Sequence, residues 1–304
     1  MATLSVVISA FNEEKNIKDC LESVKWAEEI IFVDNTSQDK TVSIAKKYTE
    51  KIFIVPNNLM LNINKNFGFE KAGGEWVLSL DADERVIPEL AKEILLAIEQ
   101  SSNRAINGYW IPRKNIIFGK WIKNQMWWPD EQLRLFRKGK GRFPENHVHE
   151  YVEIAGPAGH LINPILHFNY TSVSQFLYKM DKIYTENEAE VFLKSGKKIS
   201  WIESIRWPVA DFLKTFFAQE GYKDGLHGLV LSLLQAFYAE IVFAKVWEKQ
   251  GFWEEKEKNF LTEAGQEFKK AGSDFHYWLW ESKIKASSNP LMKLFWKLRR
   301  RLRK

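Results

Sequence analysis

The chain has 304 residues, of which 45% are hydrophobic and 27% are charged, so it can bury a full core, and its length fits one large or two medium domains. Its single cysteine, Cys20, excludes a disulfide framework and favours a reducing compartment. The formal charge of +5 is concentrated at one end, because residues 283–304 hold nine Lys or Arg and no acid, which leaves residues 1–282 with a balance of −4. An acidic body argues against a nucleic-acid-binding face.

The first hundred residues alternate between strand and helix patterns. The opening sequence, MATLSVVISAF, lacks the basic region and cleavage site of a signal peptide, and we expect it to begin the fold as a strand. Short β-rich apolar runs predict strands at 4–10, 29–34, 51–56 and 76–80. Helical spacing between these runs predicts helices at 13–26, 38–48, 61–73 and 88–100. This alternation predicts an α/β fold, with a mostly parallel, Rossmann-like sheet and helices on both faces.

The pattern changes twice further along the chain. Between residues 107 and 170, the shorter runs GYWIP, NIIFG, EQLRLFR and PILHFNY are broken by Pro and Gly, which predicts a mixed or antiparallel extension of the sheet. From about residue 172 onward the spacing is helical, and Phe and Trp are frequent. We therefore expect two domains, a sheet domain over 1–170 and a helical region over 171–304.

Acidic residues follow three of the predicted parallel strands. In open α/β sheets ligands bind outside the carboxyl ends of the strands, so the residues there are the candidates for function. Phe11-Asn12-Glu13 follows the first strand, Asp34-Asn35 the second, and Asp81-Ala82-Asp83 the fourth. Taken alone, Glu13 fits a helix N-terminus and Asp34 fits a turn equally well.

The segment GEWVLSLDADERV places Asp81, Asp83 and Glu84 within four residues, an arrangement that is repulsive if all three are ionised and unpaired. Alternate residues of an extended segment point to the same side, so Asp81 and Asp83 present two carboxylates together. Hard oxygen ligands of this kind suit Mg²⁺ or Mn²⁺, which bridge readily to phosphates. A D-x-D sequence is common by chance, and its position after a strand is what favours a metal site.

Two glycine-rich phosphate-binding motifs are absent from the sequence. No G-x-G-x-x-G follows the first strand, and G-x-x-x-x-G-K-[ST] does not occur. These absences argue against a dinucleotide oxidoreductase and a P-loop enzyme. A nucleotide would have to be held by carboxylates and a metal.

Three segments together, SVVISAFNEEKNIKDCLES, EIIFVDNTSQDKT and NKNFGFEKAGGEWVLSLDADERV, resemble the nucleotide-sugar half of GT-A fold, family-two glycosyltransferases. This resemblance covers about the first 135 residues in the expected order and spacing. A looser likeness continues in WWPDEQLRLFRKGKGRF, HVHE and GYKDGLHGLVLSLLQAFYAEIVFAKVWE, which resemble the branch containing lipopolysaccharide inner-core β-glucosyltransferases. The resemblance of about the first 135 residues implies an inverting, metal-dependent hexosyltransferase whose donor is a nucleotide-diphosphate sugar, which we expect to be UDP-linked. The looser likeness implies only the substrate class, a lipid-linked or lipopolysaccharide-core acceptor in cell-envelope glycan synthesis.

The resemblance also implies roles for individual residues. The backbone around Ala10 and Phe11 would line the base pocket with Glu13, and Asp34 would bind the uracil or nucleoside. Lys65 and Asn66 would approach the nucleotide, and Asp81 would hold the ribose. Asp83, of the DXD motif, would bind the Mg²⁺ or Mn²⁺ ion that bridges the diphosphate, and this ion would offset the neighbouring carboxylates. The sequence Asp34-Asn35-Thr36-Ser37 departs from the commoner D-D-G-S or D-S-G-S.

An inverting transferase also needs a base that takes the proton of the acceptor hydroxyl. By resemblance we expect Asp130 in this role, because family members place an acidic residue before a similar L-x-L-F strand. Glu131 is the rival, and a turn acid after Pro129 is the structural alternative.

Histidines and tryptophans supply further candidates. His149, in HVHE, lies where some GT-A enzymes supply a third metal ligand, and the other five histidines are expected to be ordinary hydrogen-bonded side chains. Tryptophans are dense in one part of the sequence, at positions 110, 121, 127 and 128. Trp127 and Trp128 would form a stacking platform for a sugar acceptor, or these tryptophans would pack in the core.

The final segment, PLMKLFWKLRRRLRK, predicts a helix lying on an anionic membrane surface. Its apolar stripe consists of Leu291, Leu294, Phe295, Leu298 and Leu302, and seven basic residues surround that stripe. Residues 228–247 are long enough to span a bilayer, but Gln235, Glu240 and Lys245 within them favour a buried or interfacial helix.

We therefore expect a cytoplasmic protein, peripheral on the inner face of the cytoplasmic membrane, that binds no nucleic acid. Two alternatives stay open. One is a nucleotidyltransferase of similar fold, which usually has a Gly-rich loop near the first strand that SAFNEEKN lacks. The other is a non-catalytic nucleic-acid-binding protein that uses the basic tail.

Overall fold

A computed structural model describes residues 2–57, 61–100, 106–145, 150–254 and 259–301. The chain forms two compact units. We call Met1–Trp121 with Trp127–Asn169 the sheet unit, and Ile122–Met126 with Tyr170–Lys304 the helical unit. Each unit is described by itself below.

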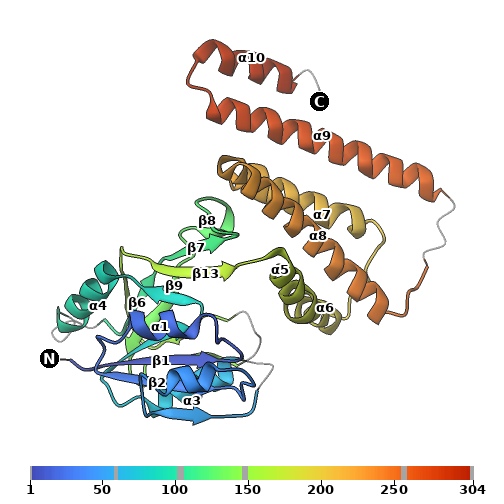
Figure 1. The fold of residues 1–304 in the computed structure, drawn as a ribbon. Helices are drawn as coiled ribbons and strands as arrows, with labels where there is room; N and C mark the ends of the chain where they lie inside the picture. Colours follow the sequence, from blue (N-terminus) through green and yellow to red (C-terminus); the bar gives the residue numbers. More distant parts are fainter. Residues whose placement is uncertain (1, 58–60, 101–105, 146–149, 255–258, 302–304) are drawn as a thin grey trace. The chain divides into compact units, whose positions relative to one another are not determined.

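A seven-stranded sheet forms the centre of the sheet unit (Figure 1), with the strand order β12-β6-β9-β4-β1-β2-β3. Its strands are β1 (Leu4–Ala10), β2 (Glu29–Asp34), β3 (Ile52–Ile54), β4 (Trp76–Asp81), β6 (Gly108–Ile111), β9 (Gln132–Arg137) and β12 (Ala158–His160). The first four strands along the chain run parallel, and β9 runs antiparallel to both β4 and β6. The predicted parallel sheet with a mixed extension is confirmed.

A second sheet of four strands has the order β5-β13-β7-β8. Its strands are β5 (Glu84–Val86), β7 (Arg113–Ile117), β8 (Lys120–Trp121) and β13 (Ile165–Tyr170). A short antiparallel pair, β10 (Gly141–Arg142) with β11 (Glu153–Ile154), completes the described strands. The strand β5 begins directly after Asp83 and pairs with β13, so the second sheet holds the chain at that point.

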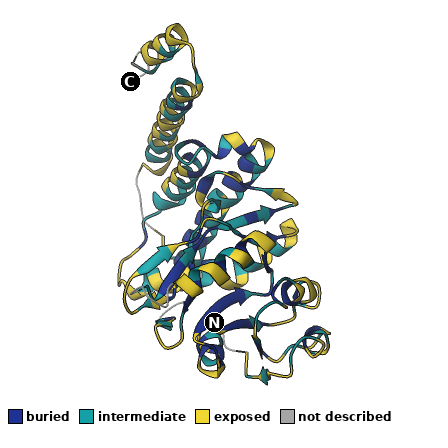
Figure 2. Cartoon of the chain, turned by 90° about the vertical axis from the view of Figure 1, so that its left-hand side faces the viewer, coloured by how far each residue is buried: buried dark blue, intermediate teal, exposed yellow. Residues whose placement is uncertain are grey.

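Helices cover both faces of the central sheet. They are α1 (Ile17–Ser23), α2 (Thr41–Ala45), α3 (Leu61–Lys71) and α4 (Pro88–Gln100). Alternate residues of β1 enter two different cores, since Val6 and Ile8 pack with α1 and α4 while Val7 packs with α3. A Cβ at Gly68 would lie 2.5 Å from Val7, so α3 approaches β1 closely only because residue 68 is glycine. Figure 2 shows these strands as the buried centre of the unit.

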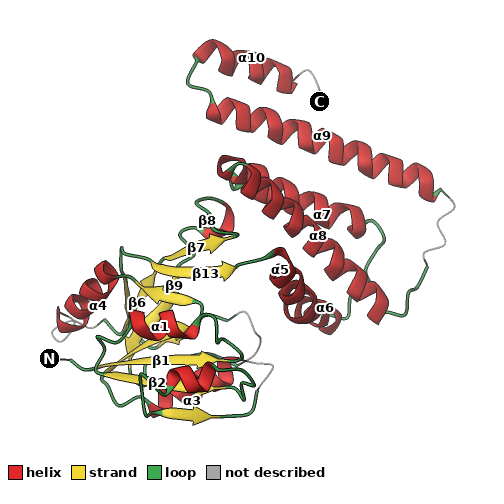
Figure 3. Cartoon of the chain, in the orientation of Figure 1, coloured by secondary structure: helices red, strands yellow, loops and turns green. Residues whose placement is uncertain are grey.

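Helices make up the helical unit from Val173 to Arg301 in the described part of the chain (Figure 3). They are α5 (Val173–Lys179), α6 (Thr185–Lys194), α7 (Glu203–Phe212), α8 (Leu226–Lys249), α9 (Phe260–Ala286) and α10 (Pro290–Arg301). Two π-helical turns, Met180–Tyr184 and Leu213–Ala218, and a 3-10 turn, Gly221–Asp224, connect them. The helical C-terminal region predicted from the sequence is confirmed.

Among the described residues, α8 is the one helix whose length and composition would suffice to cross a membrane, and 33% of its most apolar stretch is buried. Two of its polar side chains, Gln235 and Lys245, have partners on neighbouring elements of the same unit, whereas the Glu240 Oε2 atom is buried with no hydrogen-bond partner among the described residues. The Lys245 ammonium lies 3.0 Å from Asp181 and 3.3 Å from Glu186, and Gln235 donates to Asp211 at 3.3 Å. Within this unit α8 is therefore a packed helix.

Candidate active site

The acidic strand ends meet at one edge of the central sheet. In the parallel register, Ala10 of β1 pairs with Asp34 of β2, and Ser9 of β1 pairs with Asp81 of β4. The carboxyl ends of three neighbouring strands therefore bring Asp34 and Asp81 to the same edge on either side of Ala10. The sequence predicted that Asp34 and Asp81 follow strands at this edge, and the parallel register explains why the two residues lie near one another.

Asp34 is nearly completely buried, with 1% of its surface exposed. Its Oδ2 atom accepts a hydrogen bond from the Ser37 amide at 2.9 Å, whereas its Oδ1 atom is buried with no hydrogen-bond partner among the described residues. A buried carboxylate oxygen without a donor is costly, and in native structures such an atom usually marks the place of a ligand or water. This atom is therefore an acceptor available to a ligand N–H group.

The loop beyond Asp34 is fixed by polar contacts rather than by glycines. The Asn35 amide donates to the Ala10 carbonyl at 2.9 Å, and the Asn35 side chain accepts from Asn64 at 2.7 Å. Thr36 and Asn12 both have left-handed backbones, with φ of 63° and 54°. Thr36 therefore adopts a left-handed backbone where the commoner D-D-G-S and D-S-G-S sequences have glycine, and Asn12 does the same in the neighbouring β1–α1 loop.

Phe11 and Glu13 border this edge from the β1–α1 loop. Phe11 is 39% exposed. The Glu13 carbonyl accepts from the Asn16 and Ile17 amides, and its carboxylate accepts from the Asn16 side chain at 2.7 Å. Glu13 thus stabilises the start of α1, as the helix-terminus interpretation expected, while Phe11 presents its ring to solvent.

Asp81 and Glu84 are neutralised by cations that come from other elements. Lys65 of α3 lies 2.5 Å from Asp81 Oδ1, and Arg134 of β9 lies 2.5 Å from Asp81 Oδ2 and 2.7 Å from Glu84 Oε1. Burial alone would raise the pKa of Asp81, but the charges of Arg134 and Lys65 outweigh burial and hold that pKa well below its usual range. The arrangement that looks repulsive in the sequence is therefore an ion-pair network.

Glu84 is fully buried, a feature that sequence reasoning missed. Its Oε2 atom accepts the Asp81 amide at 2.9 Å, and Arg113 lies 3.5 Å from its Oε1 atom. Glu84 thus closes the turn of the DXD motif and orients Asp81. In the sequence Glu84 stands between Asp83 and Arg85, and nothing in that local pattern predicts its burial.

Asp83 faces a histidine of β13. The His167 Nε2 atom lies 3.6 Å from Asp83 Oδ1, and the Asp83 carbonyl accepts the Phe168 amide at 2.9 Å. No group of three or more His, Cys, Asp or Glu side chains able to hold a metal occurs among the described residues. Asp83 would offer such an ion a carboxylate oxygen, the kind of ligand that Mg²⁺ and Mn²⁺ prefer, and His167 would offer a nitrogen beside it. His149 and His147 lie outside the described residues.

Asp130 belongs to the same polar network, and Glu131 does not. The Asp130 Oδ2 atom accepts from Arg113 Nη2 and Asn115 Nδ2, both at 2.8 Å, and its Oδ1 atom accepts from Gln132 at 3.2 Å. The Glu131 carboxylate instead contacts the exposed His160 ring at 2.8 Å. Since Arg113 also approaches Glu84, Asp130 is linked to the carboxylates of the DXD motif through one guanidinium.

The remaining candidates are Asn66, which has a structural role, and the tryptophans, which lie partly at the surface. Asn66 is buried and bonds the backbone of Phe143 and the side chain of Glu145, so it anchors that segment of the sheet unit. Trp121 and Trp128 pack edge to face with ring centroids 5.4 Å apart, and both remain partly exposed. Lys114 lies over the Trp121 ring at 4.4 Å. Trp121 and Trp128 thus pack on one another at the surface of the sheet unit, with Lys114 against Trp121.

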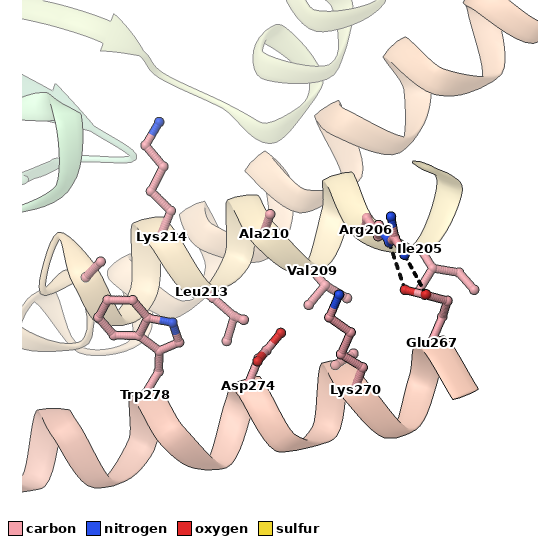
Figure 4. Close-up of a pocket in the computed structure, with 12 residues that line it drawn as sticks. Ile205, Arg206, Val209, Ala210, Leu213, Lys214, Glu267, Lys270, Asp274 and Trp278 are labelled. Carbon is pink, nitrogen blue, oxygen red and sulfur yellow. Dashed lines mark hydrogen bonds and ion pairs between the residues drawn. The ribbon is translucent and has the colours of Figure 1, made fainter. Parts of the chain in front are cut away.

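A groove of about 430 Å³ lies within the helical unit, between α7 and α9 (Figure 4). Its walls include Val209, Leu213 and Trp278, and the Arg206 guanidinium pairs with Glu267 at its rim at 2.6 Å. It contains none of the carboxylates described above. The sheet edge, and not this groove, holds the groups suited to catalysis.

The sequence was compared with protein families and with known proteins. The family model of glycosyl transferase family 2 matches residues 5–154, the segment that carries the sheet edge and the DXD motif. A glycosyltransferase of Rickettsia typhi is 30% identical over 260 residues, which cover 82% of this chain and 88% of the relative. The chain therefore belongs to glycosyl transferase family 2.

Two further proteins are similar to this chain. The lipopolysaccharide core biosynthesis glycosyltransferase LpsC of Rhizobium meliloti is 28% identical over 257 residues, covering 81% of this chain and 92% of LpsC. Among solved structures, Staphylococcus aureus TarS 1–349 in complex with UDP-GlcNAc matches with a TM-score of 0.45 and 15% identity, covering 82% of this chain and 92% of TarS 1–349.

Proposed function

We propose that this glycosyltransferase moves a hexose from a UDP-linked donor to a lipid-linked or lipopolysaccharide-core acceptor, with inversion at the anomeric carbon. One observation carries the choice of donor site. The buried, unpartnered Oδ1 atom of Asp34 lies at the carboxyl edge of a family-two sheet, beside the Ala10 backbone. Uracil has a ring N–H that would donate to this oxygen.

The cations around the DXD motif suit the rest of a nucleotide diphosphate. Lys65, 14% exposed, is the more accessible of the two cations on Asp81, and it would contact a phosphate while Asp81 accepts a ribose hydroxyl. Asp83 and His167 would hold Mg²⁺ or Mn²⁺. When bound, such an ion neutralises the charge that develops on the leaving diphosphate.

Asp130 would act as the base. Its carboxylate would take the proton of the acceptor hydroxyl as that oxygen bonds to the anomeric carbon, and the bond between that carbon and the diphosphate oxygen would break. Arg113 and Asn115 hold the Asp130 carboxylate in place. Glu131, engaged with His160, is the weaker candidate.

The helical unit would bring the enzyme to its lipid-linked acceptor. On α10, the exposed side chains of Leu291, Leu294, Phe295 and Leu298 follow the spacing i, i+3, i+4, i+7 and form one apolar stripe. The opposite side of α10 packs on α9, since Trp296 stacks on Trp280 with centroids 5.0 Å apart.

The apolar stripe on α10 is thus exposed, and basic residues flank it. This arrangement is typical of a helix that lies on the surface of an anionic membrane. We propose peripheral attachment to the cytoplasmic face of the membrane. The similarity to LpsC supports a lipopolysaccharide-type acceptor.

A thermal-shift screen tests the donor assignment. UDP-, GDP-, ADP- and CMP-sugars are compared in the presence of Mn²⁺, with the Asp34→Ala variant as the matched control. We expect UDP-sugars alone to raise the melting temperature of the wild type, and to raise that of Asp34→Ala clearly less at the same concentration. Stabilisation by another nucleotide, or equal stabilisation of both proteins, would contradict the assignment.

A further inference from the structure

We propose that Asn115 is a positioning residue that ties the metal-binding end of the active site to its proton-accepting end. The proposal rests on the function proposed above, since it assumes that Asp83 helps to bind the metal and that Asp130 is the base. Asn115 lies on β7 with none of its surface exposed. Its side-chain amide contacts both His167 and Asp130.

The partners of Asn115 determine which way its amide points. One end lies 2.8 Å from the Trp127 carbonyl and 2.8 Å from Asp130 Oδ2, and both of these atoms are acceptors. That end must therefore be the NH₂ group, and the other end must be the carbonyl oxygen. This oxygen lies 2.7 Å from His167 Nδ1.

The orientation of Asn115 in turn fixes the histidine tautomer. Because the Asn115 oxygen can only accept, Nδ1 of His167 must carry a hydrogen and donate it. In the neutral ring the lone pair is then on Nε2, the atom that faces Asp83 Oδ1 at 3.6 Å. This lone pair and the Asp83 carboxylate would both be directed at one Mg²⁺ or Mn²⁺ ion, so Asn115 would present His167 as a metal ligand.

The NH₂ end of Asn115 acts on the base. Together with Arg113, it binds Asp130 Oδ2, while Gln132 binds Oδ1 at 3.2 Å. The Asp130 carboxylate is thereby fixed in rotation, and the amide of one buried residue spans from the histidine to the base. The strand β13 lies next to β7 in the four-stranded sheet, which keeps these two anchor points in register.

Two substitutions at position 115 separate the two roles. Asn115→Asp keeps an oxygen for His167 Nδ1–H but sets a carboxylate against Asp130, so that the pair repels or shares a proton and the base is impaired. Asn115→Leu removes both contacts. His167→Gln serves as the control for the metal end, and Asn163→Ala, which removes an amide-to-Glu93 contact elsewhere in the sheet unit, serves as the control for destabilisation.

The first readout is the electron paramagnetic resonance of Mn²⁺ bound with UDP to protein labelled with ¹⁵N-histidine. We expect a directly bonded nitrogen in the wild type, in Asn115→Asp and in Asn163→Ala, and none in His167→Gln. In Asn115→Leu the nitrogen signal should be lost or the Mn²⁺ affinity should fall by about 10- to 100-fold. The second readout is turnover, which should fall by about 10²- to 10⁴-fold in Asn115→Asp with little change in donor KM.

Failure of this inference is distinguishable from failure of the proposed function. If the wild type shows the histidine nitrogen but Asn115→Leu keeps both the signal and the Mn²⁺ affinity, or Asn115→Asp keeps wild-type turnover, Asn115 is not a positioning residue and the glycosyltransferase site stands. If the wild type binds UDP and Mn²⁺ without any histidine nitrogen, the metal half of the inference is wrong. If the wild type binds no UDP-sugar, the proposed donor site is wrong and the inference falls with it.

Discussion

Replacement of Arg134 by Met should destabilise the sheet unit more than any surface charge change. Arg134 is 5% exposed, and its Nη2 atom lies 2.5 Å from Asp81 and 2.7 Å from Glu84. Met fills a similar volume but leaves both carboxylates without their main cation. Breaking a buried ion pair by removal of one partner costs about 3–5 kcal/mol.

We expect the lower end of this range, about 3 kcal/mol, because Lys65 still pairs with Asp81 and the Asp81 side chain is 26% exposed. For a domain of this size such a loss corresponds to a decrease in melting temperature of about 6–12 °C. Arg142→Met is the matched control, since Arg142 pairs with Glu70 and Glu145 while its side chain is 60% exposed. That control should show no measurable change.

The pH dependence of stability gives the loss of Arg134 a specific signature. The pKa of Asp81 is depressed in the folded protein, so its contribution to stability is present above the unfolded pKa of about 3.9 and is lost as the pH falls through the folded pKa. The difference in unfolding free energy between wild type and Arg134→Met should therefore be largest above about pH 5 and should shrink in acid.

Urea unfolding from pH 3 to 7, followed by circular dichroism, measures this difference. The double variant Arg134→Met/Glu84→Gln should recover part of the loss, because Gln leaves no buried charge at position 84. An Arg134→Met protein as stable as the wild type at pH 7, or a loss that does not vary with pH, would refute the ion-pair interpretation.

Three further predictions concern function. Asp83→Ala should abolish transfer without unfolding the protein, and full activity of this variant in excess EDTA would contradict a role for Asp83 in metal binding. Asp130→Asn should keep donor affinity while losing about 10²- to 10⁴-fold in turnover, whereas Glu131→Gln should stay active; the reverse result would make Glu131 the base. A chain ending at Asn289 should co-sediment less with anionic vesicles than the full chain does, whereas the two chains should behave alike with neutral vesicles. Equal binding of both chains to anionic vesicles would contradict a role for α10 as a membrane anchor, and so would binding of RNA or DNA by the full chain in place of vesicles.

The alternation of apolar strands and amphipathic helices was sufficient to predict the central sheet and its functional edge. Local pattern determines where β1, β2 and β4 end, and parallel pairing then brings Asp34 and Asp81 together whatever the rest of the chain does. The helical C-terminal region followed from spacing in the same way, and so did the apolar stripe of α10.

Contacts between distant segments could not be predicted from local pattern. Glu84 is buried only because Arg134 and Arg113 reach it from strands 50 and 29 residues away. His167 faces Asp83 because β13 pairs with β5, with His167 opposite Glu84. A strand's register with a remote partner depends on tertiary packing, so neither the histidine nor its contact with Asn115 was visible in the sequence.

Calorimetric titration of a UDP-sugar into the wild type and into Asp34→Ala, both with saturating Mn²⁺, tests the central claim most directly. Hydrogen bonds to charged groups contribute about 1.5–3 kcal/mol, so the loss of the Asp34 carboxylate should weaken binding by roughly 10- to 150-fold. Asp34→Ala should remain folded, because it loses one hydrogen bond, from the Ser37 amide to Oδ2, while the Oδ1 atom has no partner within the described residues. Equal affinities for the two proteins, or no binding to the wild type, would contradict a nucleotide-sugar site at this edge of the sheet.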